Sequence, residues 1–323
     1  MNRKLKQLAA SAAFAAGLAG SAHAECGDVS ITQMDWESAI VVTSVSTFLL
    51  EQGYGCNVTV IPSASVPALA SVSETGKPDI LTEIWANSAT AYDKLIEDGV
   101  IRELTDVLSD GGVEGFWIPD YLAEAHPELT TLQGVVANPE LVGKRFHNCP
   151  EGWTCQVIGT NITLAAGFEQ AGIENWIHGS GETLAASLAS AYDNKEPWFG
   201  YYWAPTSLLG RYSMVPVDIG PHDPEVHECN RDRECATPKI GAWPASKVAT
   251  VVTNSFAESH PEETALMKNV SFTNDIMGAL LAWKQENKAS GEEAAVYFLN
   301  NYKDIWRGWL NDAARAQLSA LLQ

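Results

Sequence analysis

Basic residues are scarce in this chain, which has 20 lysines and arginines against 40 aspartates and glutamates and a formal net charge of −20. This balance excludes nonspecific binding to nucleic acid or anionic lipid, because both require clustered positive charge. It is compatible with a cationic or zwitterionic ligand. An acidic surface whose charges are simply solvated explains it equally and is the commoner case.

Common catalytic signatures are also absent. The sequence has no G-x-S-x-G, H-E-x-x-H or Walker motif, and Gly179-Ser180-Gly181 lacks the context of a nucleophile elbow. A glycosidase needs only two carboxylates that meet in a cleft, and these leave no local signature. We therefore expect that this protein is not an enzyme. The alternative is an exported carbohydrate-active enzyme.

Long apolar segments are missing as well, since the one apolar stretch near the N-terminus, Leu8–Ala19, is too short for a membrane span of ~20 residues. Basic residues precede this stretch and Ala22-His23-Ala24 follows it, which is typical of a signal peptide. We predict that residues 1–24 are removed and that the mature protein is soluble and periplasmic. Residues 1–24 hold three basic and no acidic residues, so the mature chain carries 17 basic and 40 acidic residues.

The six cysteines predict three disulfides, because an exported chain folds in an oxidising compartment where free thiols are uncommon. Two pairs each bracket a short loop. The third pair lies just before the starts of two strands that are expected to be neighbours. The predicted pairs are Cys149–Cys155, Cys229–Cys235 and Cys26–Cys56.

The chain length indicates two domains of about 150 residues, and the pattern of apolar residues predicts an α/β fold. Expected strands are Val29–Met34, Val58–Ile61, Ile80–Trp85, Pro197–Trp203 and Val248–Val252. Helices are expected over residues 37–52, after Ser65, after Ser88 and over Thr163–Ala171. Further helices are expected after residue 260, and the final helix should carry Ile305, Trp309 and Leu310. The segment 216–238 is expected to be a loop.

Two of the eleven tryptophans are placed where a ligand site is expected. Trp36 and Trp85 follow the carboxyl ends of parallel strands, the edge at which open α/β sheets bind ligands. Regular alternation along the strand places Glu83 on the same side as Trp85. Indole offers the strongest aromatic face for a desolvated cation, although most single tryptophans fill cores. The helical spacing of Trp283, Trp306 and Trp309 indicates packing.

Several motifs occur in a fixed order: Asp79-Ile-Leu-Thr-Glu-Ile-Trp85, Cys149-x3-Trp153-x-Cys155, the segment 195–205 with Trp203, and Gly241-Ala-Trp-Pro-Ala-Ser-Lys-Val. With them, nearly all of the mature chain resembles the periplasmic binding proteins for glycine betaine, choline, proline and related methylated amines. These proteins feed ATP-driven importers. Among them, the chain looks most similar to trimethylamine N-oxide binders.

The resemblance implies two α/β lobes joined by crossing strands. Lobe one would hold residues 25–116 and 244–323, and lobe two residues 117–243. The aromatic cage of the family would fall on Trp85, Trp153 and Trp203, to which we add Trp36 because of its location. Lobe closure would complete the cage around the ligand.

The polar end of the ligand is less well defined. The resemblance implies that the backbone N–H groups of Thr154 and Cys155 bind a betaine carboxylate. Glu83 would repel a carboxylate, attract choline, or bind an N-oxide through a water or through its own proton. The alternative is a residue at the end of a strand that only pairs with a nearby donor. Tyr201, Tyr202 and His147 are further candidates. We expect trimethylamine N-oxide as the ligand, with glycine betaine or choline as alternatives and a sugar as a third class.

The resemblance implies permease and ATPase subunits as partners, and we expect a monomer that needs no cofactor. The segment Asp218–Glu234 is rich in carboxylates, among them Asp218, Asp223 and Glu228, which are ligands of the type that calcium uses. Their spacing does not match an EF-hand, so a solvated acidic loop is favoured over a structural calcium ion. His222 and His227 raise the alternative of a transition metal.

Overall fold

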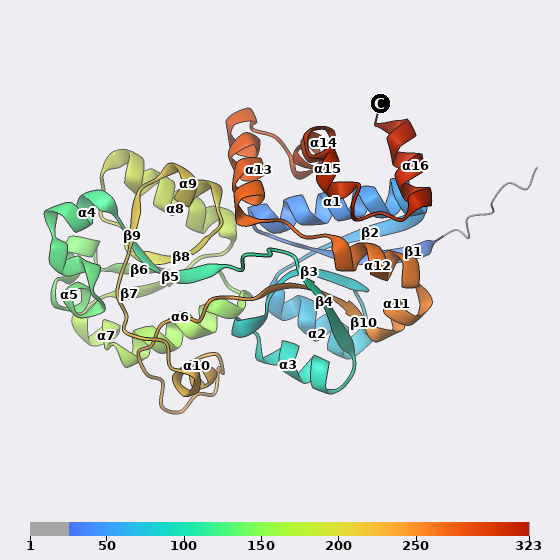
Figure 1. Ribbon diagram of the computed structural model, residues 1–323. Helices are drawn as coiled ribbons and strands as arrows, with labels where there is room; N and C mark the ends of the chain where they lie inside the picture. Colours follow the sequence, from blue (N-terminus) through green and yellow to red (C-terminus); the bar gives the residue numbers. More distant parts are fainter. Residues whose placement is uncertain (1–25, 323) are drawn as a thin grey trace, which may run out of the picture.

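The computed structural model describes residues 26–322 and shows two lobes side by side, each built on a five-stranded sheet with helices packed against it (Figure 1). The predicted signal peptide, residues 1–24, lies outside the described residues. Within the described range, no helix is long and apolar enough to cross a membrane. The α/β two-lobed fold expected from the sequence is confirmed.

The sheet of the first lobe has the strand order β2-β1-β3-β10-β4. Its strands are β1 (Gly27–Met34), β2 (Cys56–Ser63), β3 (Ile80–Trp85), β4 (Ile101–Asp106) and β10 (Val248–Thr253). Strand β1 runs parallel to β2 and β3, whereas β10 runs antiparallel to β3 and β4. Every residue of β3 and β10 is buried, which explains why both are mostly apolar.

Helices from both ends of the chain build the rest of this lobe (Figure 1). They are α1 (Glu37–Tyr54), α2 (Ser65–Thr75), α3 (Thr90–Glu97), α11 (Asn254–Ser259), α12 (Pro261–Asn269), α13 (Asn274–Asn287), α14 (Gly291–Asn301), α15 (Lys303–Trp306) and α16 (Asp312–Leu321). Helix α1 buries one side from Ala39 to Leu50, and α14 and α16 pack against it. The C-terminal helices therefore complete the core that the N-terminal strands begin.

The second lobe has the strand order β7-β6-β8-β5-β9. Its strands are β5 (Val113–Pro119), β6 (Arg145–Asn148), β7 (Glu174–Ile177), β8 (Gly200–Ala204) and β9 (Met214–Pro216). Its helices are α4 (Asp120–Ala125), α5 (Leu132–Ala137), α6 (Thr154–Ala165), α7 (Phe168–Ala171), α8 (Gly181–Asn194), α9 (Ser207–Arg211) and α10 (Pro224–Asn230). Aromatic side chains such as Phe116, Phe146 and Phe199 fill the core of this lobe.

The chain crosses between the lobes twice, and the two crossings pair with each other. The backbone N–H of Gly112 donates to the carbonyl of Ser246 at 2.8 Å, and the N–H of Ser246 donates to the carbonyl of Gly112 at 2.9 Å. Strand β5 follows the first crossing directly and belongs to the second sheet over its whole length. The predicted lobe boundary between residues 116 and 117 therefore falls inside β5, a few residues after the crossing.

Three local predictions were wrong. The helix predicted over residues 163–171 is α6, which begins at Thr154, followed by α7 after Gly167 takes a φ of 70°. The predicted loop 216–238 contains α10, because the Asp223 side chain caps its N-terminus and Pro224 begins it. The final helix is α16, capped by Asn311, so Trp309 and Leu310 precede it.

All three predicted disulfides are present. Cys26–Cys56 joins the starts of β1 and β2, where Gly27 and Cys56 are partners in the parallel register. Cys149–Cys155 closes the loop that leads into α6, and Cys229–Cys235 ties the end of α10 to the following turn. The second of these bonds fixes the segment that carries Trp153.

Candidate functional site

A small aromatic cavity lies between the two lobes. Both lobes contribute to its wall, which is formed by Trp36, Ser65, Trp85, Glu114, Trp153, Thr154, Cys155, Tyr201 and Trp203. The structure thus brings together all four predicted tryptophans, and each is at most 8% exposed. Thr154 and Cys155, the predicted backbone donors, lie in the same wall.

The indoles of the two lobes meet edge to face. The ring centroids of Trp36 and Trp153 are 5.0 Å apart with an interplanar angle of 68°, and those of Trp153 and Trp203 are 5.1 Å apart at 76°. Trp36 belongs to the first lobe, whereas Trp153 and Trp203 belong to the second. Because successive rings are nearly perpendicular, they form adjoining walls, and the negative face of an indole attracts positive charge.

Trp85 completes the wall from the end of β3, and a glycine makes room for it. A Cβ atom on Gly112 would lie 2.3 Å from both Cη2 and Cζ3 of the Trp85 ring. No side chain fits at this distance, so Trp85 packs directly on the backbone of the first lobe crossing. The wall of the cavity and the hinge between the lobes are therefore in contact.

The loop closed by Cys149–Cys155 places both a ring and hydrogen-bond donors at the cavity. Trp153 is the N-cap residue of α6, and Thr154 and Cys155 are its first two residues. The first N–H groups of a helix have no partner within the helix and attract negative charge. This end of the cavity can therefore bind an oxygen atom of a ligand.

Glu83 lies outside the wall of the cavity and behind Trp36. The indole Nε1–H of Trp36 donates to Glu83 Oε2 at 2.5 Å, and the Ser38 hydroxyl donates to the same oxygen at 2.9 Å. Thr82 and Glu83 together face the single residue Thr250 on β10, and Glu83 has a φ of 52°. This bulge interrupts the alternation on which the sequence interpretation relied. Glu83 thus orients Trp36 from behind.

Burial raises the pKa of Glu83 from its ordinary value of 4.5 to about 7, although the bonds from Trp36 and Ser38 oppose the shift. The folded protein then binds this proton more tightly than the unfolded chain, so between these pH values the free energy of unfolding falls as the pH rises. Because Gln cannot ionise, Glu83→Gln is expected to gain about 2 to 3 kcal/mol relative to wild type between pH 5 and pH 8. Urea unfolding at both pH values measures this difference, and a difference independent of pH contradicts it.

Glu114 is a residue of the wall that the sequence interpretation missed. Its carboxylate accepts the Tyr201 hydroxyl at 2.8 Å and the hydroxyls of Ser246 and Ser88 at 2.5 and 3.3 Å. Burial raises its pKa, and the same bonds oppose the shift. One signal could have revealed it: Glu114 is the only ionisable residue in the otherwise apolar strand β5.

The other candidates lie elsewhere. His147 stacks on Trp198 and its Nδ1 is 3.0 Å from His178 Nε2, while burial lowers the pKa of His147 to about 3 and that of His178 to about 4. Tyr202 lines a larger neighbouring cavity instead. Of the three further polar candidates, the structure therefore places only Tyr201 in the wall of the aromatic cavity.

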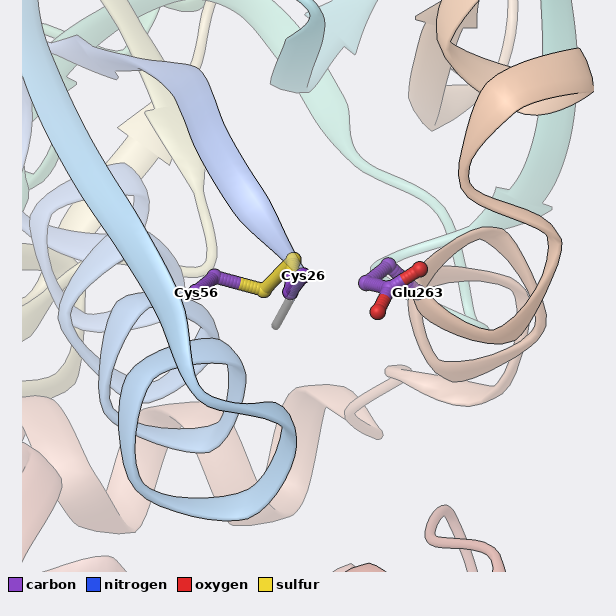
Figure 2. A group of neighbouring side chains, drawn as sticks. All are labelled: Cys26, Cys56 and Glu263. Carbon is purple, nitrogen blue, oxygen red and sulfur yellow. A yellow bond between two sulfur atoms is a disulfide. The ribbon is translucent and has the colours of Figure 1, made fainter. Parts of the chain in front are cut away.

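The carboxylates of the acidic segment have local partners. Asp218 accepts the N–H of Gly220, Asp223 caps α10, and Glu228 pairs with Arg231. Within residues 26–322, the one group of three closely spaced side chains of metal-ligating type is Cys26, Cys56 and Glu263. Figure 2 shows that the two sulfur atoms of this group are bonded to each other, so neither is available as a thiolate ligand.

Two α/β lobes that meet over a small aromatic cavity define a solute-binding protein. The chain belongs to the family described as the substrate-binding domain of ABC-type glycine betaine transport systems, whose profile matches residues 27–301. It is therefore the substrate-binding component of an ABC transporter of the glycine betaine and choline type, not an enzyme. Proteins of this family need no cofactor.

Individual proteins are similar to this chain over most of its length. The chain is 24% identical over 309 residues to the trimethylamine N-oxide-binding protein of Pelagibacter ubique (strain HTCC1062), covering 90% of this chain and 93% of that protein. A choline-binding protein in complex with choline superposes with a TM-score of 0.75 at 17% identity, covering 92% and 99% of the two chains. The glycine betaine/L-proline-binding protein of Borrelia burgdorferi gives 0.73 at 17% identity, covering 90% and 99%. The choline-binding protein and the Borrelia burgdorferi protein therefore share the fold of this chain.

Proposed function

We propose that this protein captures trimethylamine N-oxide in the aromatic cavity by closure of its lobes and delivers it to the permease and ATPase subunits of an importer. In this proposal the protein acts as a monomer in the periplasm. Residues 1–24 are removed on export, so the mature protein begins at Glu25, and mass spectrometry of the exported protein measures this. The observation that carries the proposal is a single cavity walled by four indoles from both lobes with one buried carboxylate.

The indoles account for the affinity. A desolvated methylammonium group gains ~0.5–2 kcal/mol from each aromatic face that it contacts. Three or four such faces, less the free-energy cost of closing the lobes, are sufficient for micromolar binding at about −8 kcal/mol. Because the rings come from both lobes, only the closed protein offers all of them, and the ligand therefore favours closure.

The charge of the wall favours trimethylamine N-oxide over glycine betaine. Among the described residues that form the wall there is no Lys or Arg to hold a carboxylate in a bidentate pair. The Glu114 carboxylate would repel that of betaine, whereas an N-oxide oxygen needs only one or two donors, which the N–H groups of Thr154 and Cys155 supply. The relative from Pelagibacter ubique supports the same choice.

Glycine betaine and choline are the second candidates, and each is supported by one feature of the wall. The N–H groups at the start of α6 suit a carboxylate, and Glu114 suits the positive charge of choline. Glu83 should affect the affinity for all three ligands equally, because it acts through Trp36.

We expect trimethylamine N-oxide to raise the melting temperature of the mature protein by about 5 °C at a concentration one hundred times its Kd, since such a ligand adds ~2.7 kcal/mol of stability. Choline and glycine betaine should need higher concentrations for the same shift, and maltose, the control sugar, should give none. Thermal unfolding with each compound measures this order. If all three amines fail at millimolar concentrations, the proposed function is wrong. A tenfold preference for betaine would overturn the choice of ligand alone.

A further inference from the structure

The residues on either side of Trp36 connect the two lobes. Asp35 Oδ1 accepts the indole Nε1–H of Trp153 at 2.7 Å, and Glu37 Oε2 accepts the Ser207 hydroxyl at 2.5 Å. Asp35 and Glu37 belong to the first lobe, whereas Trp153 and Ser207 belong to the second. The tripeptide Asp35-Trp36-Glu37 thus supplies one wall of the aromatic cavity and two carboxylates that bind the opposite lobe.

These bonds lie on the outer side of the aromatic cavity. A second, larger cavity between the lobes is lined by Asp35, Glu37 and Ser207, and it shares Trp36 and Trp203 with the first. The bond between Asp35 and Trp153 therefore joins a residue that lines the second cavity to one that lines the first, whereas Glu37 and Ser207 both line the second.

Gly181 adds an independent observation at the same place. A Cβ atom on Gly181 would lie 2.9 Å from Cζ2 of Trp153 and 3.1 Å from the backbone oxygen of Asp35. Gly181 is the first residue of α8, and its φ is not positive, so its own backbone does not require glycine. The missing side chain instead allows both Trp153 and the backbone of Asp35 in the first lobe to lie against the start of α8.

We propose that Asp35 is a positioning residue that holds Trp153 across the closed cleft and thereby sets the rate at which ligand leaves. The inference deepens the proposed function and rests on it for the identity of the ligand. Because the two partners lie in different lobes, the bond exists only when the lobes are closed. Trp153 is 5% exposed and its bond to Asp35 is part-buried, so loss of Asp35 removes the protein acceptor of its indole N–H. The bond therefore stabilises the closed state and leaves the open state unchanged.

Stopped-flow fluorescence with trimethylamine N-oxide tests the effect on rates. Asp35→Ala is expected to raise the dissociation rate constant about tenfold and to change the association rate constant less than threefold. Asp35→Asn keeps an oxygen acceptor and should recover most of the loss. Asp193→Ala is the matched control, because Asp193 accepts the Tyr212 hydroxyl at 3.0 Å within the second lobe, and it should leave both constants unchanged.

Gly181→Ala tests the same contact without removing a hydrogen bond. Alanine is favoured in helices, so the ligand-free protein should melt at the wild-type temperature or higher. The added Cβ should nevertheless raise the dissociation rate constant, because it separates Trp153 from Asp35. Wild-type dissociation rates in both Asp35→Ala and Gly181→Ala would overturn the inference.

The ligand-free protein gives a readout that does not depend on the ligand. Spin labels on the variants Ser73→Cys and Gln133→Cys, at exposed positions of the first and second lobes, report the distance between the lobes. The closed fraction should be smaller in Asp35→Ala and Gly181→Ala than in wild type, and equal fractions in all three proteins would contradict the inference. A wild-type protein that binds no methylated amine would instead show that the proposed function is wrong.

Discussion

Replacing Trp153 with alanine is expected to lower the affinity for trimethylamine N-oxide about a hundredfold, more than the same change at any other indole of the cavity. Trp153 is the central ring, since it contacts both Trp36 and Trp203 and donates to Asp35. The substitution removes an aromatic face worth up to ~2 kcal/mol and a bond between the lobes worth about 1 kcal/mol. Together these correspond to about two powers of ten in Kd. Isothermal titration calorimetry measures the change.

The matched control is Trp309→Ala, which removes an equally buried indole from the core of the first lobe. Trp309 packs against Phe272 and Phe298, away from the cavity. We expect this variant to lose about 3 to 5 kcal/mol of stability and to bind with wild-type affinity where it is folded. Wild-type affinity in Trp153→Ala would remove this ring from the ligand site. A loss of affinity in Trp309→Ala equal to that in Trp153→Ala would show that the effect is not specific to the cavity.

The sequence was sufficient for the fold and for the rings because both depend on local patterns. Strand β3 was predicted with the bounds that the structure gives, since its mostly apolar sequence indicates a buried strand. Trp36 and Trp85 could be placed together because neighbouring parallel strands end at one edge of a sheet. Trp153 and Trp203 came from the family resemblance, as no local pattern connects them with the first lobe.

The polar groups of the site could not be predicted in the same way. Glu83 was expected beside Trp85, but the bulge at Thr82 and Glu83 depends on pairing with β10, which lies more than 160 residues further along the chain. Glu114 acquires its role from Ser88, Tyr201 and Ser246, which come from three distant segments. Such contacts arise from tertiary structure and leave no periodic signal in the sequence.

The selectivity of the site is expected to depend on Glu114 more than on any other side chain of the wall. Glu114→Gln should weaken binding of trimethylamine N-oxide and choline about tenfold and leave that of glycine betaine equal or improved. In its ionised form, Glu114 carries a charge in a desolvated wall, where it attracts the methylated nitrogen of every ligand and repels only a ligand that carries a carboxylate. Gln removes both effects and adds an N–H donor that a carboxylate can use.

Glu83→Gln is the matched control for this prediction, because Glu83 is also buried and hydrogen-bonded but lies behind Trp36. It should change the affinity for all three amines by the same factor, as it acts only through the position of one ring. Competition titrations of each variant with the three amines, at pH 7.5, measure the ratios. The contradicting result is a changed order of affinities in Glu83→Gln together with the wild-type order in Glu114→Gln. The charge that selects the ligand would then act from behind Trp36, and the role assigned to Glu114 would be wrong.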